Sequence, residues 1–233
     1  MLTNKAPFDN RALRQAVAYA LNPEPIVKGI FYGHTQAAIS PVSPLSWAYN
    51  PDFKGITYDP AKAKAKLAEG GKPEGMEVTL TSYNTEDYAP VIEAIQAQLK
   101  DVGIKIVPKL GVEATITQMQ RDGNYQIALT QWAGKLDPDS LYTMFHSKGG
   151  YNYKGYNNPK VDELLGKARQ TFDQKERKRY YDEAVPLLVE DASEPVLFYR
   201  PTLAASSPKV QNYKLMPGWY HQFETLKNVW LKR

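Results

Sequence analysis

The feature that most constrains the fold is an alternation of strand-like and helix-like segments between residues 76 and 132. Segments 76–82, 104–110 and 125–132 have the length and the apolar pattern of strands. The segment between the first two carries apolar residues at helical spacing, and a shorter helix is expected before the third. This order predicts an α/β domain with a mixed sheet that is flanked by helices.

Helices are also expected on both sides of this alternating region. Asp59 and Asn158 each precede a proline, which is the usual N-cap and N1 pair at the start of a helix. A long helix over 173–190 should be kinked by Pro186. The remaining predictions are a helix that starts at the N-cap Asp9, a short helix over 23–33, an irregular loop over 35–58 and a buried strand over 194–206.

The residue types of the chain exclude several kinds of chemistry. The sequence has no cysteine, which excludes thiolate metal sites, disulfides and cysteine nucleophiles. Its three histidines, His34, His146 and His221, have no metal-ligand spacing, and no phosphate loop or nucleophile motif is present. We therefore expect no catalytic residue, no metal site, no cofactor and no enzymatic activity.

The charge pattern argues against a nucleic-acid partner. The 29 basic and 25 acidic residues leave a net charge of +4 and are interspersed, as in residues 173–184. No apolar run approaches the ~18 residues of a membrane span, and residues 1–10 do not resemble a signal peptide. If the protein is exported, we expect its targeting segment to lie outside this sequence.

The segment TQWAGKLDPDS, residues 130–140, carries the most chemistry. Asp137 before Pro138 fits the N-cap and N1 of a helix, and Asp139 would then favour its positive end. The alternative is a hydrolase or carbohydrate-active domain with Asp137 and Asp139 as an acid pair. Acids two residues apart rarely reach the roughly 5–9 Å separation that glycosidases need. Helix capping is therefore the preferred role of Asp137.

Capping does not account for Trp132 and Lys135. A Trp at a strand end can be the flat wall of a ligand site, since α/β folds bind ligands at that edge. A Lys nearby can be a point charge for a carboxylate or phosphate. A Trp that covers the sheet end beside a solvated Lys is an equally good interpretation of these residues.

Several segments resemble the extracytoplasmic solute-binding proteins of peptide-type ABC transporters, the family of oligopeptide-, dipeptide- and glutathione-binding proteins. They are PFDNRALRQAVAYALNPEPIVKGIFYG, ISPVSPLSWAYNPDFKGITYDPAKAKAKLAEGG, GYNNPKVDELLGKAR and EPVLFYRPTLAA, which follow one another over about residues 5–205. The resemblance implies a periplasmic-binding-protein-like fold of which only the second, C-terminal lobe is present. It assigns residues 1–207 to that lobe and residues 208–233 to a segment that returns to the first lobe.

The resemblance also suggests ligand contacts. In peptide binders of this family, an acid after the Trp pairs with the ligand's α-amino group and an Arg precedes the Trp; Lys135 and Leu129 occupy those positions here. The pattern is closer to W-S-G-R-x-DPD, found in a subgroup that includes glutathione binders. It implies that Lys135 faces an anionic group and that Trp132 packs on an apolar part of the ligand. Tyr199 matches a cleft-facing tyrosine, and Gln131 is predicted as a further polar contact.

The function implied by the resemblance is solute binding for an ABC importer. The expected partners are a peptide or a peptide-like anionic small molecule, the missing first lobe and a membrane permease. The expected location is periplasmic or otherwise extracytoplasmic. Without the first lobe, the apolar residues of 208–233 lack partners, which favours self-association of the isolated lobe or a rearrangement of this segment.

Overall fold

The computed structural model describes residues 1–132, 137–200, 203–215 and 225–232. Its main sheet has β2 (Met76–Tyr83) at the centre, with β3 (Ile104–Gly111) and β4 (Ile127–Leu129) parallel to it on either side. Antiparallel pairing occurs in two separate small sheets. They are β1 (Gln36–Ala37) with β5 (Phe198–Tyr199), and β6 (Val210–Gln211) with β7 (Trp230–Leu231). The predicted α/β class is confirmed, and both pairing directions occur, but in separate sheets.

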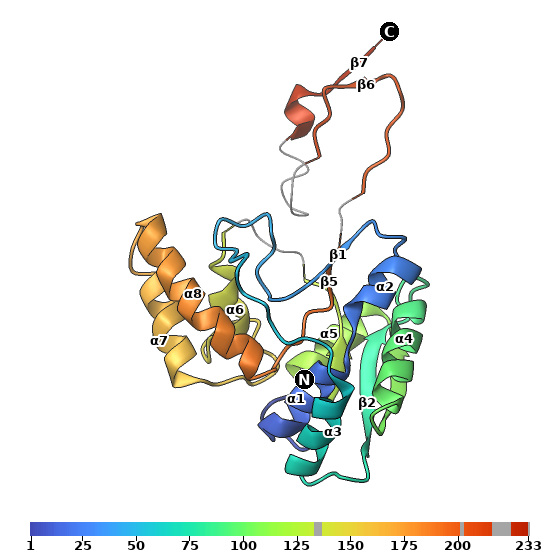
Figure 1. The fold of residues 1–233 in the computed structure, drawn as a ribbon. Coiled ribbons are helices and arrows are strands. Elements are labelled where there is room, and N and C mark those ends of the chain that lie inside the picture. The colour runs from blue at the N-terminus through green and yellow to red at the C-terminus, as the bar shows by residue number, and fades with distance from the viewer. Residues whose placement is uncertain (133–136, 201–202, 216–224, 233) are drawn as a thin grey trace.

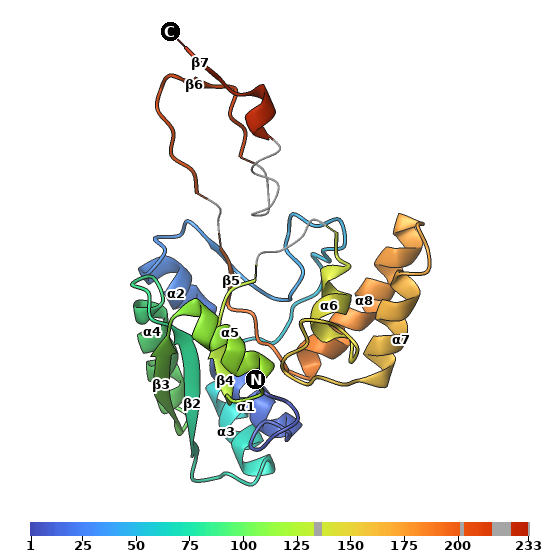
Figure 2. The same cartoon turned by 180° about the vertical axis from the view of Figure 1, so that it is seen from behind.

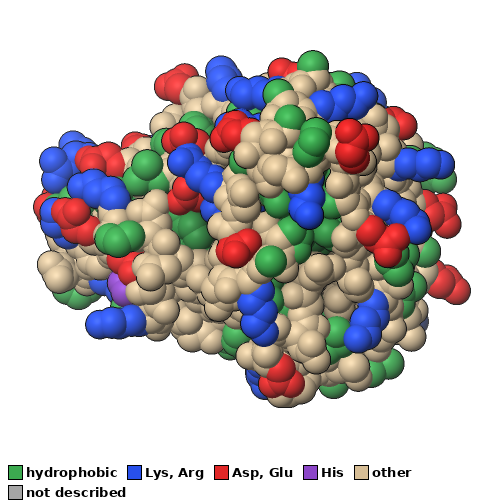
Figure 3. Space-filling model, turned by 90° about the horizontal axis from the view of Figure 1, so that it is seen from below, with side chains coloured by type: hydrophobic (Ala, Val, Ile, Leu, Met, Phe, Trp, Pro, Cys, Tyr) green, Lys and Arg blue, Asp and Glu red, His purple; other side chains and the backbone are tan. Residues whose placement is uncertain are grey.

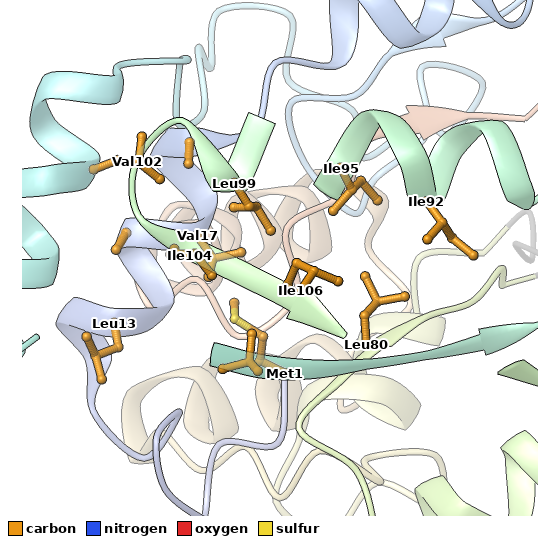
Figure 4. Packing of buried hydrophobic residues seen from close by; sticks show 14 of the residues in the cluster. Met1, Leu13, Val17, Leu80, Ile92, Ile95, Leu99, Val102, Ile104 and Ile106 are labelled. Atoms are coloured by element: carbon orange, nitrogen blue, oxygen red, sulfur yellow. The ribbon is translucent and has the colours of Figure 1, made fainter. Parts of the chain in front are cut away.

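Helices cover the main sheet (Figures 1 and 2). One face packs against α1 (Arg11–Ala20), α3 (Pro60–Glu69) and α4 (Ala89–Lys100), and α5 (Glu113–Arg121) covers the other side. Figure 4 shows Ile95 and Leu99 of α4 against Ile104 and Ile106 of β3. These side chains recur at helical and at alternating spacing, so each element buries one apolar face in a shared core.

A second core lies among the helices of residues 137–190. It is formed by α6 (Ser140–Phe145), α7 (Pro159–Ala168) and α8 (Gln174–Glu190), which stand to one side of the sheet (Figure 1). Val42 and Ala48 of the loop after β1, and Tyr156, are buried in the same core. The predicted cap of α7 is confirmed, because Asn158 accepts the backbone N–H of Lys160 (3.0 Å) before Pro159. Helix α8 runs from Gln174 to Glu190 with Pro186 inside it.

Buried polar contacts join the two cores. The Arg14 guanidinium of α1 donates to the carbonyl oxygens of Phe8 (2.8 Å) and of Asp191 (2.8 Å), which follows α8. Gln15 donates to the carbonyl of Glu190 at 2.8 Å. Because both side chains are buried, these bonds fix α1 against the end of α8.

Two sequence predictions need correction. The cap of α1 is Asn10, whose side chain accepts the N–H of Ala12 at 2.9 Å, and not Asp9. Among the described residues of 194–206, only the two residues of β5 form a strand, and they are partly buried. Helix α2 (Pro23–Gly29) and the irregular loop that follows it were predicted. The short strand β1 inside that loop was not.

The described part of residues 203–232 extends away from the rest of the chain and contains the β6–β7 pair (Figures 1 and 2). Its large apolar side chains are exposed, among them Leu203, Trp230 and Leu231. In the residues that the structure describes, no helix has both the length and the apolar character needed to cross a membrane.

Candidate functional site

The candidate site lies at the carboxyl edge of the parallel sheet. Ser82 of β2 is in register with Leu129 of β4, so the residues that follow the two strands emerge side by side. Tyr83 ends β2 and leads into the segment before α4, while Gln131 and Trp132 follow β4. This is the edge at which open α/β sheets bind their ligands.

Trp132 belongs to a row of rings at this edge. It is 40% exposed, and its ring meets that of Tyr151 edge to face, with centroids 4.9 Å apart. Tyr151 is 45% exposed and lies 5.9 Å from Tyr153, whose hydroxyl accepts from Arg121 Nε at 3.3 Å. Trp132 is therefore an accessible ring and not part of either buried core. Exposed rings of this kind offer an apolar wall to a ligand.

The sequence analysis did not single out Tyr151 and Tyr153. They lie in the segment GGYNY, where two glycines precede a Tyr-x-Tyr pair. Glycine pairs indicate a turn, but nothing in the local pattern tells which strand the turn will meet. The local sequence therefore does not predict the two ring contacts, Trp132 with Tyr151 and Tyr151 with Tyr153.

Arg200 links three segments at the same edge. It directly follows β5, donates from Nη1 to Gln131 Oε1 at 2.8 Å and forms an ion pair from Nη2 with Asp87 Oδ2. The other oxygen of Asp87 accepts from Thr85 Oγ1 at 2.6 Å. The Thr85 hydroxyl, and after it Arg200, hold the pKa of Asp87 below its usual value despite partial burial.

The four predicted ligand contacts have different surroundings. Trp132 and Gln131 both lie at the sheet edge, and Gln131 is oriented by Arg200. The Tyr199 hydroxyl points to the loop after β1, where the carbonyl oxygens of Ser40 (2.8 Å) and Val42 (2.9 Å) accept its proton. Partial burial raises the pKa of Tyr199. Lys135 lies outside the described residues.

The predicted capping role of Asp137 is wrong. Helix α6 begins at Ser140, with Asp139 as the N-cap residue, and no side chain caps it. Asp137 instead accepts the backbone N–H of Asp139 (2.9 Å) and binds both terminal nitrogens of Arg177, at 2.6 and 3.0 Å. Asp139 makes a similar bidentate ion pair with Arg169, at 2.5 and 2.7 Å. The two acids thus attach this segment to α7 and α8.

These ion pairs argue against the acid-pair alternative. Burial alone would raise the pKa of Asp137, but the bonds from Arg177 and the Asp139 N–H outweigh it and keep the pKa below its usual value. A general acid needs the opposite change, since it must stay protonated near neutral pH. Within the described ranges, no group of three or more His, Asp or Glu side chains is arranged to hold a metal ion.

Charge on the surface is mixed. Basic and acidic side chains alternate over the face drawn in Figure 3, without a broad area of one sign. Such a face lacks the continuous basic stripe that binds a nucleic-acid backbone.

Comparison with known families gives a match over most of the chain. Residues 1–153 match the family described as "Bacterial extracellular solute-binding proteins, family 5 Middle". The dipeptide-binding protein of Escherichia coli K12 is 29% identical in an alignment 232 positions long, which covers 95% of this chain and 43% of that protein. The glutathione-binding protein GsiB of the same strain is 30% identical in an alignment 237 positions long, which covers 96% of this chain and 46% of that protein.

Solved structures show the same fold. The periplasmic binding protein DppA of Helicobacter pylori, in complex with the peptide STSA, superposes with a TM-score of 0.91 and 29% identity. That match covers all of this chain and 46% of DppA. A dipeptide-binding protein of Pseudoalteromonas sp. SM9913, in complex with Met-Leu, gives a TM-score of 0.84 and 28% identity, over 93% of this chain and 45% of that one. The chain therefore spans less than half of the length of these relatives.

Proposed function

The chain belongs to the family 5 bacterial extracellular solute-binding proteins, and on that premise we propose that it is one lobe of the substrate-binding component of an ABC importer. The family consists of binding proteins and not of enzymes. The observation that carries the proposal is the exposed ring of Trp132, with Tyr151 beside it, at the carboxyl edge of the sheet. We propose residues 1–207 as the lobe and residues 208–233 as the segment that returns to its partner lobe.

The proposed ligand is a peptide or a peptide-like anionic small molecule. Relatives are named for dipeptides and glutathione, and two similar structures hold the peptides STSA and Met-Leu. Trp132 supplies an apolar wall, and Gln131 a polar contact beside it. Lys135 is proposed to face an anionic group of the solute. The ring of Tyr199 is the fourth proposed contact, because its hydroxyl is already bound to backbone.

The proposed partners follow from two-lobed binding. Closure of a second lobe over the edge would bury the solute between two surfaces and stabilise the closed form. That closed form is what an ABC permease in the membrane would bind. An extracytoplasmic location, on the side from which an importer receives its solute, completes the proposal.

The test is ligand binding by the protein with both lobes, measured by titration calorimetry with Met-Leu and with glutathione. We expect Trp132→Ala to weaken binding of the better probe about tenfold or more, since a lost apolar wall costs at least about 1.4 kcal/mol. Lys135→Ala should weaken binding of glutathione more than that of Met-Leu, because glutathione carries more carboxylates.

The control is Phe172→Ala, which removes a ring that is more exposed than that of Trp132 and lies between α7 and α8, away from the sheet edge. It should leave both affinities unchanged. Equal losses in the Trp132 and Phe172 variants would place the site elsewhere. Unchanged affinity in the Lys135 variant would remove Lys135 from the site.

A further inference from the structure

The contacts of Arg200 are typical of a residue that binds a ligand and not of one that stabilises the fold. Its side chain is 41% exposed and that of Asp87 is 43% exposed, so water reaches both partners of the ion pair. Such pairs contribute only ~0–1 kcal/mol to stability. Arg14, by contrast, is buried and its guanidinium bonds to main-chain carbonyls. The two arginines therefore differ in what their removal should affect.

The guanidinium of Arg200 has unused donors. An arginine carries five N–H donors in a planar fork, and the contacts among the described residues use one on Nη1 and one on Nη2. Gln131 holds the fork through Nη1, independently of Asp87. A second carboxylate can therefore approach the Arg200 guanidinium while Gln131 keeps the guanidinium in its orientation.

If the Asp87 carboxylate loses its ion pair with Arg200, it still accepts a hydrogen bond and stays in contact with water. Its Oδ1 accepts from Thr85 Oγ1, whereas the ion pair uses the other oxygen, Oδ2. If Arg200 turned to another anion, Asp87 would keep the hydroxyl and gain water on its free oxygen. The exchange therefore trades one exposed ion pair for another and leaves no buried charge unpaired.

We propose that Arg200 is the receptor for a carboxylate of the solute, and that Asp87 is its counter-ion in the unliganded lobe, displaced when the solute binds. The inference rests on the proposed function and specifies the ligand as carboxylate-bearing. A planar carboxylate fits the guanidinium fork with two parallel bonds, which an amide cannot reproduce. Arg200 reaches the segment of Trp132 through Gln131, so the charge and the ring serve one solute.

The proposal predicts opposite effects for the two partners. Arg200→Gln should remove the preference for a carboxylate. Asp87→Asn should strengthen that preference, because it removes the competing anion and keeps an oxygen for Thr85. If the Arg200–Asp87 ion pair only holds the fold together, both variants should instead lose peptide binding.

The experiment uses the two-lobed protein and a random tripeptide pool without Asp or Glu. The pool is offered in two forms, with free C-terminal carboxylates and with C-terminal amides, and retained peptides are identified by native mass spectrometry. We expect the wild type to favour the free acids about tenfold or more, Arg200→Gln to lose that preference and Asp87→Asn to raise it about threefold or more. Glu77→Gln, which breaks the exposed Lys105–Glu77 pair at the other end of β2, should behave as the wild type. Circular dichroism checks that each variant is folded.

Each other outcome has a defined meaning. Equal retention of acids and amides by the wild type would leave peptide binding in place and overturn the role of Arg200. Loss of the preference in both variants, or no change in Asp87→Asn, would overturn the exchange. If the wild type retains neither pool, the result contradicts the proposed peptide binding and, with it, the proposed role of Arg200.

Discussion

Arg14 and Arg200 place the same guanidinium in opposite surroundings, and the difference separates stability from binding at the residue scale. Arg14 is 7% exposed and bonds to the carbonyl oxygens of Phe8, Asp9 and Asp191. Arg200 is exposed and bonds to two side chains at the sheet edge. The first arginine completes a buried network, and the second is the one proposed to bind the solute.

Replacing Arg14 should therefore destabilise the fold. Arg14→Met leaves main-chain carbonyls between α1 and α8 without their donors, and we expect a loss of about 2–3 kcal/mol in the free energy of unfolding. Urea denaturation followed by circular dichroism measures it. The control is Arg179→Met, an exposed arginine of α8 whose guanidinium lies over the Tyr180 ring and should contribute under about 1 kcal/mol. Equal losses in the two variants would contradict the role given to Arg14.

At the scale of elements, two glycines control how β2 and β3 begin. Gly75 precedes β2 with φ +93°, and a Cβ built on it would lie 2.1 Å from the carbonyl oxygen of Gly103, which precedes β3. That oxygen accepts the N–H of Met76 at 3.0 Å, the first bond between the two strands. A side chain at Gly75 would thus push the strands apart where their pairing starts.

We expect Gly75→Ala to destabilise the protein more than Gly71→Ala. Both positions have positive φ, which costs an L-residue about 1–2 kcal/mol, but a Cβ at Gly71 meets no atom within 4 Å. The clash at Gly75 should add about 1–3 kcal/mol. Thermal and urea denaturation of the two variants measure the difference; similar losses would show that the close approach of Gly75 to Gly103 is unimportant.

Helix starts show how far local sequence predicts these elements. Asn158 and Asp59, each before a proline, cap α7 and α3 as expected, because an N-cap bond involves only the next three residues. Asp137 has the same pattern, and its side chain accepts the N–H two residues on, but α6 begins only at Ser140, so Asp137 is not its N-cap. Its pair with Arg177, 40 residues away, has no signal in the local pattern. The candidate site likewise has one part that the sequence predicts and one that it does not. Strand order predicts the edge at which Trp132 lies, whereas the pair of Asp87 with Arg200 joins residues 113 apart and has no local signal.

At the scale of the whole molecule, the chain has two buried cores and an extended segment with little cover. The sheet core and the helical core each bury their own apolar faces, whereas Trp230 and Leu231 of β7 are mostly exposed. Adjacent exposed apolar side chains of this size favour association. The segment is where we expect the chain to meet another surface.

The 233-residue chain alone is therefore expected to self-associate at micromolar concentration, and the double variant Trp230→Ser, Leu231→Ser to associate at least about threefold more weakly. Analytical ultracentrifugation measures the dissociation constants. Phe172→Ser removes a fully exposed ring elsewhere and is the matched control. A monomeric wild-type chain at every concentration, or equal weakening by the control, would contradict the assignment of the association to β7.

The contact of Tyr199 with Ser40 also has a consequence for biosynthesis. These residues are 159 positions apart, so the loop after β1 leaves the ribosome long before the tyrosine that holds it. At ordinary elongation rates of about 5–20 residues per second, this interval is on the order of ten seconds. Arg200 is translated immediately afterwards. The edge proposed to receive the solute is thus assembled late, so a nascent chain acquires its binding surface only after most of its core has been made.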